Sequence, residues 1–192
     1  MGGDRLRELI DSRGGKPSRP CHRGCVIRCS NVFVDEKGEY VTASLEYETM
    51  VMNGSNLDIS DLDSLARLDR AMDDAGLDSI ETGATLGVAM EMGLLEWGDV
   101  EGALSLIDEA KKGTIRGKLI GSGTAVLGKV LGARRVPEVK GQSMVAYDPR
   151  TFKGMGCTYA TSTMGADHTA GPAIPGRGGL DPDKSFELTE AE

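Results

Sequence analysis

Three cysteines stand within nine residues near the start of this 192-residue chain. They are Cys21, Cys25 and Cys29 in the run PCHRGCVIRC, and the chain has one other cysteine, Cys157. Thiols four residues apart share one face of a helix, and a loop of the same spacing can also fold three thiolates around one metal centre. The alternative is a buried helix face, but the charged and helix-breaking residues between the thiols form no apolar stripe. We therefore expect a metal site.

The choice of metal depends on the residues around these thiols. A structural zinc ion takes four ligands, and His22 follows Cys21 so directly that the sequence places it poorly for chelation of the same ion. Arg23 and Arg28 supply positive charge, which stabilises thiolates and a negatively charged cluster. An iron–sulfur cluster is therefore the preferred interpretation, with zinc as the alternative.

A second candidate site is the run DDAGLD, Asp73 to Asp78. It places carboxylates on both sides of a tight Gly76-Leu77 turn between two expected helices, where they could accept hydrogen bonds from a donor-rich ligand such as a pterin ring. The alternative is a helix cap with a solvated aspartate, which is the commoner role of such a run in isolation. The motif alone does not decide between them.

A third candidate is the stretch FKGMGCTYATSTMGADHTAGP, residues 152–172. Its glycines and hydroxyl groups would let the backbone approach a ligand closely, and it holds His168, one of only two histidines in the chain. An ordinary flexible loop is the alternative. Residues 117–121, GKLIG, do not match a phosphate-binding loop.

The rest of the chain predicts a mostly α-helical fold, a helical bundle with one small β-hairpin. The hairpin is expected within residues 31–48, where apolar and polar residues alternate around a DEKG turn. Helices are expected from apolar spacing and from capping residues, including a capping-box-like pair of Asp78 and Glu81. The expected helices cover residues 5–13, 60–76, 78–93, 99–113 and 118–131.

Composition excludes several classes of protein. A formal net charge of −8 with scattered basic residues argues against nucleic acid as a partner. The sequence contains no apolar run of the ~20 residues that a membrane helix needs, and its polar start does not resemble a signal peptide. We therefore expect a cytoplasmic protein without a membrane partner, in a reducing compartment where clustered cysteines more often bind metal than form disulfides.

Taken in order, the runs CHRGCVIRCSN, EYETMVMNGSN, DDAGLDSIETG and KGMGCTYATSTMGADHTAGP resemble the tungsten-dependent aldehyde ferredoxin oxidoreductase family. The likeness extends over residues 5–175. It implies an enzyme that oxidises aldehydes to carboxylic acids at a tungsten, or sometimes molybdenum, bis-pterin centre, and passes electrons through a [4Fe-4S] cluster to ferredoxin. It also implies helical second and third domains.

The same likeness implies roles for individual residues. Cys21, Cys25 and Cys29 would bind the cluster, and Asp73, Gly76, Leu77 and Asp78 would hold one pterin. Glu48 and His168 would line the substrate pocket, with His168 on the carbonyl oxygen and Glu48 on the attacking water.

The sequence also departs from the family pattern. The family's first cysteine spacing is C-x-x-C, whereas this chain has three residues between Cys21 and Cys25. The family's fourth cluster cysteine lies in a D-x-x-G-L-C motif that this sequence does not contain, and Cys157 is expected to be a packing residue instead of a replacement. The β-rich N-terminal domain that seats the bis-pterin has no counterpart here.

These departures predict a piece of a larger enzyme. Residues 1–150 would form a helical domain with the cysteine loop and the first pterin motif, and residues 151–192 the incomplete start of a following domain with a Pro/Gly-rich tail. The missing N-terminal and C-terminal segments would then be partners of this chain, together with ferredoxin and the aldehyde. The alternative is a non-catalytic iron–sulfur or zinc-binding electron-transfer module that has lost the pterin site.

Overall fold

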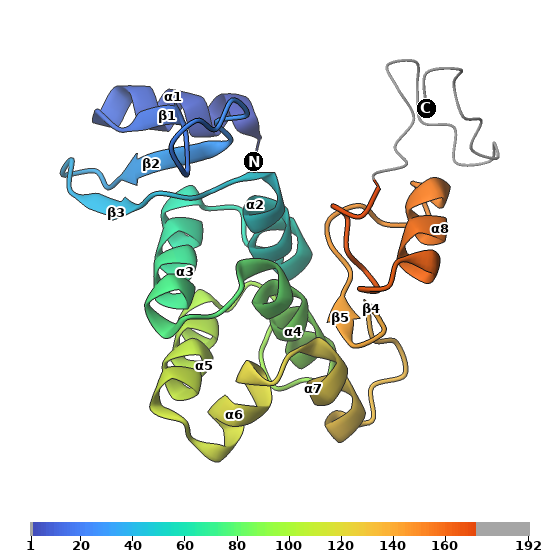
Figure 1. The fold of residues 1–192 in the computed structure, drawn as a ribbon. Coiled ribbons are helices and arrows are strands. Elements are labelled where there is room, and N and C mark those ends of the chain that lie inside the picture. The colour runs from blue at the N-terminus through green and yellow to red at the C-terminus, as the bar shows by residue number, and fades with distance from the viewer. Residues whose placement is uncertain (1, 172–192) are drawn as a thin grey trace, which may run out of the picture.

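The computed structural model describes residues 2–171, and Figure 1 shows them as a ribbon. Three short strands and a helix at the N-terminus lie beside a bundle of helices, and a smaller C-terminal part follows it. The elements are α1 (Gly3–Arg13), β1 (Lys16–Arg19), β2 (Ser30–Val34), β3 (Tyr40–Thr42), α2 (Tyr47–Asn53), a 3-10 turn (Ser55–Leu57), α3 (Leu62–Ala75), α4 (Ser79–Glu91), α5 (Val100–Lys112), α6 (Ile115–Gly121), α7 (Thr124–Leu131), β4 (Glu138–Val139), β5 (Gln142–Ser143) and α8 (Lys153–Thr161). The mostly α-helical class expected from the sequence is confirmed.

Capping residues set the ends of the central helices, as the sequence predicts. The carboxylates of Asp61, Asp78 and Asp99 each accept a hydrogen bond from a backbone amide in the first turn of α3, α4 and α5. Gly76 and Gly113 end α3 and α5 in the left-handed conformation, with φ of 68° at both.

The helix expected over residues 118–131 is wrong, because the chain forms two helices there. Gly123 separates α6 from α7 with a φ of 86°. The amide of Thr124 donates to Glu81 of α4, 2.7 Å away, so the first turn of α7 is held by another helix. This tertiary bond interrupts an apolar pattern that reads as continuous in the sequence.

The N-terminal strands form one antiparallel sheet in the order β1-β2-β3. Asp35 closes the turn between β2 and β3 by accepting from the amides of Lys37 and Glu39. The expected hairpin is therefore confirmed, but its second strand ends at Thr42, and residues 47–53 form α2 instead. Glu48 consequently lies in the first turn of a helix.

The helices enclose one large apolar core, and a smaller cluster belongs to the C-terminal part. Helix α4 lies at the centre, in contact with α2, α3, α6, α7 and β5. The smaller cluster contains Val145, Met155, Tyr159 and Ala166, all buried. The division at residue 150 stays a prediction. The Pro/Gly-rich tail lies outside the described residues, and no helix within them is long and apolar enough to cross a membrane.

Candidate functional site

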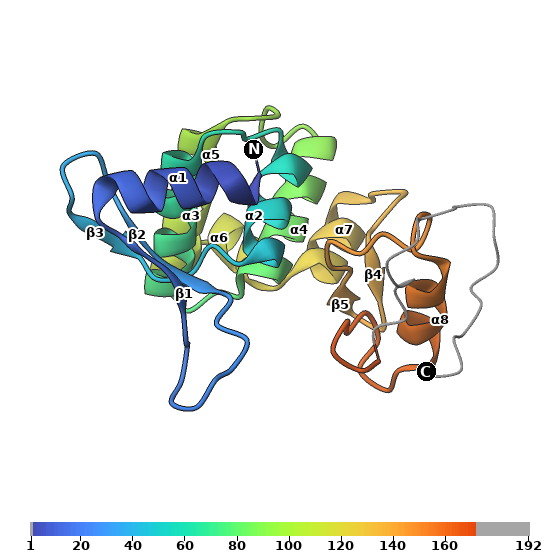
Figure 2. The ribbon, with the colours of Figure 1, turned by 90° about the horizontal axis from the view of Figure 1, so that it is seen from above.

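The cysteine loop connects β1 to β2. The two strands pair at Arg19 and Ser30, and Figure 2 shows the loop between them projecting away from the helices. Cys21, His22 and Cys25 each offer one possible ligand atom, and these three atoms lie within 4.8 Å of one another. His22 Nδ1 lies 3.2 Å from Cys21 Sγ, at hydrogen-bonding distance, and whether His22 could bind a metal with Cys21 stays untested.

The remaining two cysteines lie outside this group. Cys29 does not share the 4.8 Å separation with both Cys21 and Cys25, so its part in a common site stays a prediction. Cys157 lies on α8 and is exposed, so the expectation that it is a packing residue is wrong. The apolar face of α8 is instead formed by Met155 and Tyr159.

The DDAGLD run forms a tight corner between α3 and α4, as predicted. The amide of Gly76 donates to the Asp73 carbonyl at 3.0 Å, and the amide of Leu77 donates to the carbonyl of Met72 at 2.9 Å. One oxygen of Asp78 caps α4. The Asp73 side chain is exposed and pairs with no other side chain of the described residues, so both carboxylates keep oxygens available to an external donor.

Helix α2 is fixed to the start of α4 by a row of polar contacts. The hydroxyls of Thr49 and Ser79 lie 3.0 Å apart, and the amide of the fully buried Asn53 donates to the Ser79 carbonyl at 2.9 Å. Asn56 donates to the Gly83 carbonyl at 3.2 Å. A side chain at Gly83 would meet the backbone of α2 at 2.8 Å. This row, which the sequence reasoning missed, sets Glu48 at a fixed place relative to the corner.

Glu48 is half-buried and meets the C-terminal part of the chain. Its Oε2 accepts from the Ala146 amide at 2.8 Å, and its Oε1 is buried without a partner among the described residues. Burial raises the pKa of Glu48, an effect opposed by the Ala146 hydrogen bond and by attraction to His168.

The ring of Tyr147 lies close to both Tyr47, the neighbour of Glu48 in sequence, and His168. Its centroid lies 5.6 Å from the Tyr47 ring and 5.9 Å from the His168 ring. The structure thus brings His168 and Glu48 into the same part of the fold, although they lie 120 positions apart in the sequence. Their catalytic roles stay predictions.

The side chain of Glu81 makes contacts that the sequence reasoning did not predict. Its Oε1 accepts from the Thr124 amide, and its Oε2 accepts from the Ser143 amide at 2.9 Å. Half of the expected capping box forms, since Asp78 accepts from the Glu81 amide at 2.8 Å, but the Glu81 carboxylate makes these two bonds instead of reaching back to Asp78. One carboxylate therefore holds α7 and β5 against α4.

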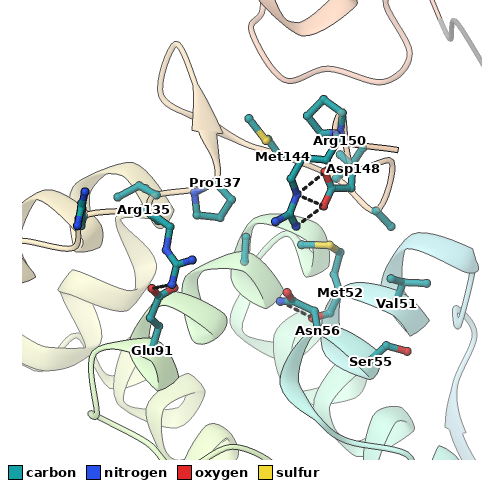
Figure 3. Close-up of a pocket in the computed structure, with 16 residues that line it drawn as sticks. Val51, Met52, Ser55, Asn56, Glu91, Arg135, Pro137, Met144, Asp148 and Arg150 are labelled. Atoms are coloured by element: carbon teal, nitrogen blue, oxygen red, sulfur yellow. Dashed lines mark hydrogen bonds and ion pairs between the residues drawn. The ribbon is translucent and has the colours of Figure 1, made fainter. Parts of the chain in front are cut away.

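A pocket of about 810 Å³ lies beside Glu48, between α2, α4 and residues 134–150 (Figure 3). Its walls include Met52, Pro137 and Met144, and Ala146 joins it to Glu48. Three arginines also line it, and two of them are paired with a carboxylate: Arg135 with Glu91 and Arg150 with Asp148. Apolar and charged side chains thus line the pocket together.

Comparison with known proteins identifies the family of this chain. The family model described as aldehyde ferredoxin oxidoreductase, domains 2 and 3, matches residues 1–191. The chain belongs to this family. The resemblance inferred from the four sequence runs is therefore confirmed.

Individual relatives agree with the family assignment. The tungsten-containing aldehyde ferredoxin oxidoreductase of Pyrococcus furiosus is 33% identical over 79% of this chain, and that of Thermococcus kodakarensis is 32% identical over the same share. An aliphatic sulfonate oxidoreductase, WOR-like subunit, of Pyrococcus furiosus is 27% identical over 81% of the chain. The matches cover 27% to 29% of these relatives' own lengths, so the chain corresponds to part of each.

The donor groups of this chain suit the cofactors that the family implies. Soft thiolates on an exposed loop are ligands for an iron–sulfur cluster, and they are equally ligands for zinc. The corner at Asp73 and Asp78 offers carboxylate oxygens of the kind that accept from a pterin's amino and ring N–H groups.

Proposed function

We propose that this chain is a piece of an enzyme that oxidises aldehydes to carboxylic acids. It would use a tungsten, or molybdenum, bis-pterin and a [4Fe-4S] cluster, with ferredoxin as electron acceptor, in the cytoplasm. The observation that carries the proposal is the placement of Glu48 and His168 around Tyr147, beside a pocket, with Glu48 on a helix that is fixed to the start of α4 at the DDAGLD corner. The bound cofactors would accept the two electrons of the oxidation and carry them onward.

The binding groups follow from the donor sets already described. Cys21, Cys25 and Cys29 would hold the cluster. Asp73 and Asp78 would accept from the pterin, with Gly76 and Leu77 forming the turn between them. Because Asp78 uses one oxygen to cap α4, its other oxygen would remain for the pterin.

The chemistry of the reaction gives Glu48 and His168 separate tasks. Oxidation of an aldehyde adds one oxygen atom from water and releases two protons with the two electrons. A carboxylate whose pKa is raised by burial is a better proton acceptor than an exposed one, which suits Glu48 for removing a proton from water or from the hydrate. The imidazole of His168 would donate a hydrogen bond to the carbonyl oxygen.

The unpartnered oxygen of Glu48 supports this division of tasks. A buried carboxylate oxygen without a hydrogen bond costs free energy unless another group completes it. Water or the hydrated aldehyde would be such a group. The pocket beside Ala146 would then hold the rest of the substrate between the apolar side chains of Met52, Pro137 and Met144.

The test requires the enzyme restored with its missing segments. Glu48→Gln and His168→Asn should each lower turnover ~100-fold or more, because each removes a proton-transfer or hydrogen-bonding group. Tungsten and iron contents should stay unchanged. Glu46→Gln is the matched control, since Glu46 precedes α2 and hydrogen-bonds Ser44. Near-normal turnover in both test variants would refute the assignment.

The second candidate is a non-catalytic electron-transfer module that kept the metal loop. The exposure of Cys21 and Cys29, away from the pocket, favours it as an independent site. Anaerobic reconstitution of the 192-residue chain should give substoichiometric iron and sulfide, which Cys25→Ser removes. Neighbouring genes that encode the missing N-terminal domain and the second pterin motif would favour the enzyme instead.

A further inference from the structure

The side chain of Asn31 lies at the base of the cysteine loop and hydrogen-bonds to three segments of the chain. Asn31 is the second residue of β2 and is half-buried. Its Oδ1 accepts from the amide of Ser18 at 3.3 Å, on the strand that enters the loop. Its Nδ2 donates to the Cys29 carbonyl at 3.1 Å, where the loop ends, and to the Leu45 carbonyl at 3.3 Å. One side-chain amide therefore joins both ends of the loop to the segment that precedes α2.

A β-bulge explains why the Ser18 amide needs this acceptor. The register of β1 against β2 shifts by one residue, so Pro17 and Ser18 of β1 together lie opposite Asn31. Proline has no amide hydrogen to donate, and the additional residue of a bulge is left without a partner in the ladder of hydrogen bonds. The Asn31 side chain supplies the partner that the β2 backbone does not.

The backbone is left-handed at non-glycine residues in each of the three places that Asn31 reaches. The angle φ is 54° at Ser18, 59° at Leu45 and 52° at Arg28, which precedes Cys29. Residues other than glycine rarely adopt this conformation, and it persists only where surrounding contacts hold it. The hydrogen bonds of Asn31 are such contacts, so this side chain stabilises the conformations that begin the loop, end it and lead into α2.

We propose that Asn31 is a positioning residue that fixes the cysteine loop relative to helix α2. Leu45 lies three positions before Glu48, and Cys29 is one of the proposed cluster ligands. By bonding both carbonyls, the Asn31 amide connects the segments that carry the acid and the cluster. Its importance for the cluster rests on the proposed function. Hydrogen bonds and solvent exposure around the thiolates set the reduction potential of an iron–sulfur cluster, so release of this end of the loop should change that potential.

Amide hydrogen exchange of the metal-free 192-residue chain tests these contacts directly. In Asn31→Ala all three side-chain hydrogen bonds are lost, so the protection factor of the Ser18 amide should fall about threefold to tenfold. Asn31→Asp keeps an acceptor for Ser18 but donates to neither carbonyl, so it should retain that protection. The backbone amide at position 31, which donates to the Ser44 carbonyl at 3.0 Å, should lose protection in both variants, because the connection to the segment before α2 is gone.

Asp35→Ala is the matched control, because it weakens the same strand at its other end. Asp35 accepts from the amides of Lys37 and Glu39 in the turn after β2. Its substitution should lower the stability of the sheet while the Ser18 protection factor stays within about twofold of that in the unsubstituted chain. An equal fall in Ser18 protection in Asp35→Ala would show that Asn31 contributes only general stability to the sheet, and would overturn the inference.

The reduction potential of the cluster separates a positioning role from a structural one. After anaerobic reconstitution of the same chain, Asn31→Ala and Asn31→Asp should shift the potential and the EPR spectrum of the bound cluster, whereas Asp35→Ala should change neither. Lost amide protection in Asn31→Ala without a shift in potential would overturn the positioning role. If the unsubstituted chain takes up no iron and sulfide, the proposed cluster is refuted, and exchange at Ser18 and at position 31 alone decides whether Asn31 fixes the loop.

Discussion

Asp69 is a buried acid in the middle of α3 and gives the sharpest prediction about stability. It is 1% exposed, and its Oδ2 accepts from the hydroxyl of Thr42 at 2.5 Å. Burial raises the pKa of Asp69 from 3.8 to about 6, and the negative charges of Asp73 and Glu46 add to the effect. The hydrogen bond from Thr42 opposes it only in part.

The magnitude follows from linkage between protonation and folding. The folded chain binds the Asp69 proton more tightly than the unfolded chain, so the protonated acid stabilises the fold at low pH. That contribution is fully present below the unfolded pKa of 3.8 and is lost as pH rises through about 6. The difference in pKa corresponds to about 3 kcal/mol.

The substitution Asp69→Asn isolates this effect, because asparagine has nearly the same shape and no charge to bury. The free energy of unfolding of the variant minus that of the unsubstituted chain should rise by about 3 kcal/mol as the pH is raised from 3.5 to 7.5. Urea unfolding followed by circular dichroism at several pH values measures this, with Asp4→Asn, an exposed substitution, as control. A stability difference that does not change with pH would refute the reasoning.

Two other predictions concern packing and ion pairing. Gly117→Ala should lower the free energy of unfolding by about 1–3 kcal/mol or more, because the new Cβ would overlap the backbone of α5. Gly121→Ala is the control in the same helix: its Cβ has room, so the substitution should be neutral or stabilising in the same denaturation assay. Arg13→Ala should lower the free energy of unfolding by roughly 2 kcal/mol, since the Arg13 guanidinium donates to both oxygens of Asp63 and is largely buried. Arg7→Ala removes an exposed ion pair with Asp11 and should lower it by under about 1 kcal/mol. Equal losses within either matched pair, measured as shifts in urea midpoint, would contradict the corresponding explanation.

The helix ends were predictable because local chemistry sets them. Asp61, Asp78 and Gly76 satisfy backbone groups within a few residues of themselves, so the sequence alone contains the signal. The break at Gly123 was not predictable in this way, because a bond from Thr124 to another helix imposes it. Helix α8 was missed since its glycines have low helix propensity and the apolar period there is weak.

In the candidate site, too, features set by local sequence were predictable and features set by tertiary contacts were not. The corner at Asp73 and Asp78 was predictable in shape from capping rules. The proximity of Glu48 to His168 depends on how the C-terminal part packs on α2, which neither local sequence contains. The hydrogen-bonding distance of 3.2 Å between Cys21 Sγ and His22 Nδ1 could not be predicted, because adjacency in sequence says little about where two side chains point.

The hydrogen bond from Ala146 to Glu48 has a consequence for when the site comes into existence. It joins residues 98 positions apart, and contacts of such long sequence separation form late in folding because the intervening chain must first be ordered. During synthesis, Glu48 therefore leaves the ribosome well before the segment that partners it. The exchange rate of the Ala146 amide with deuterated solvent would report how often a finished chain releases that segment and returns to the unassembled state.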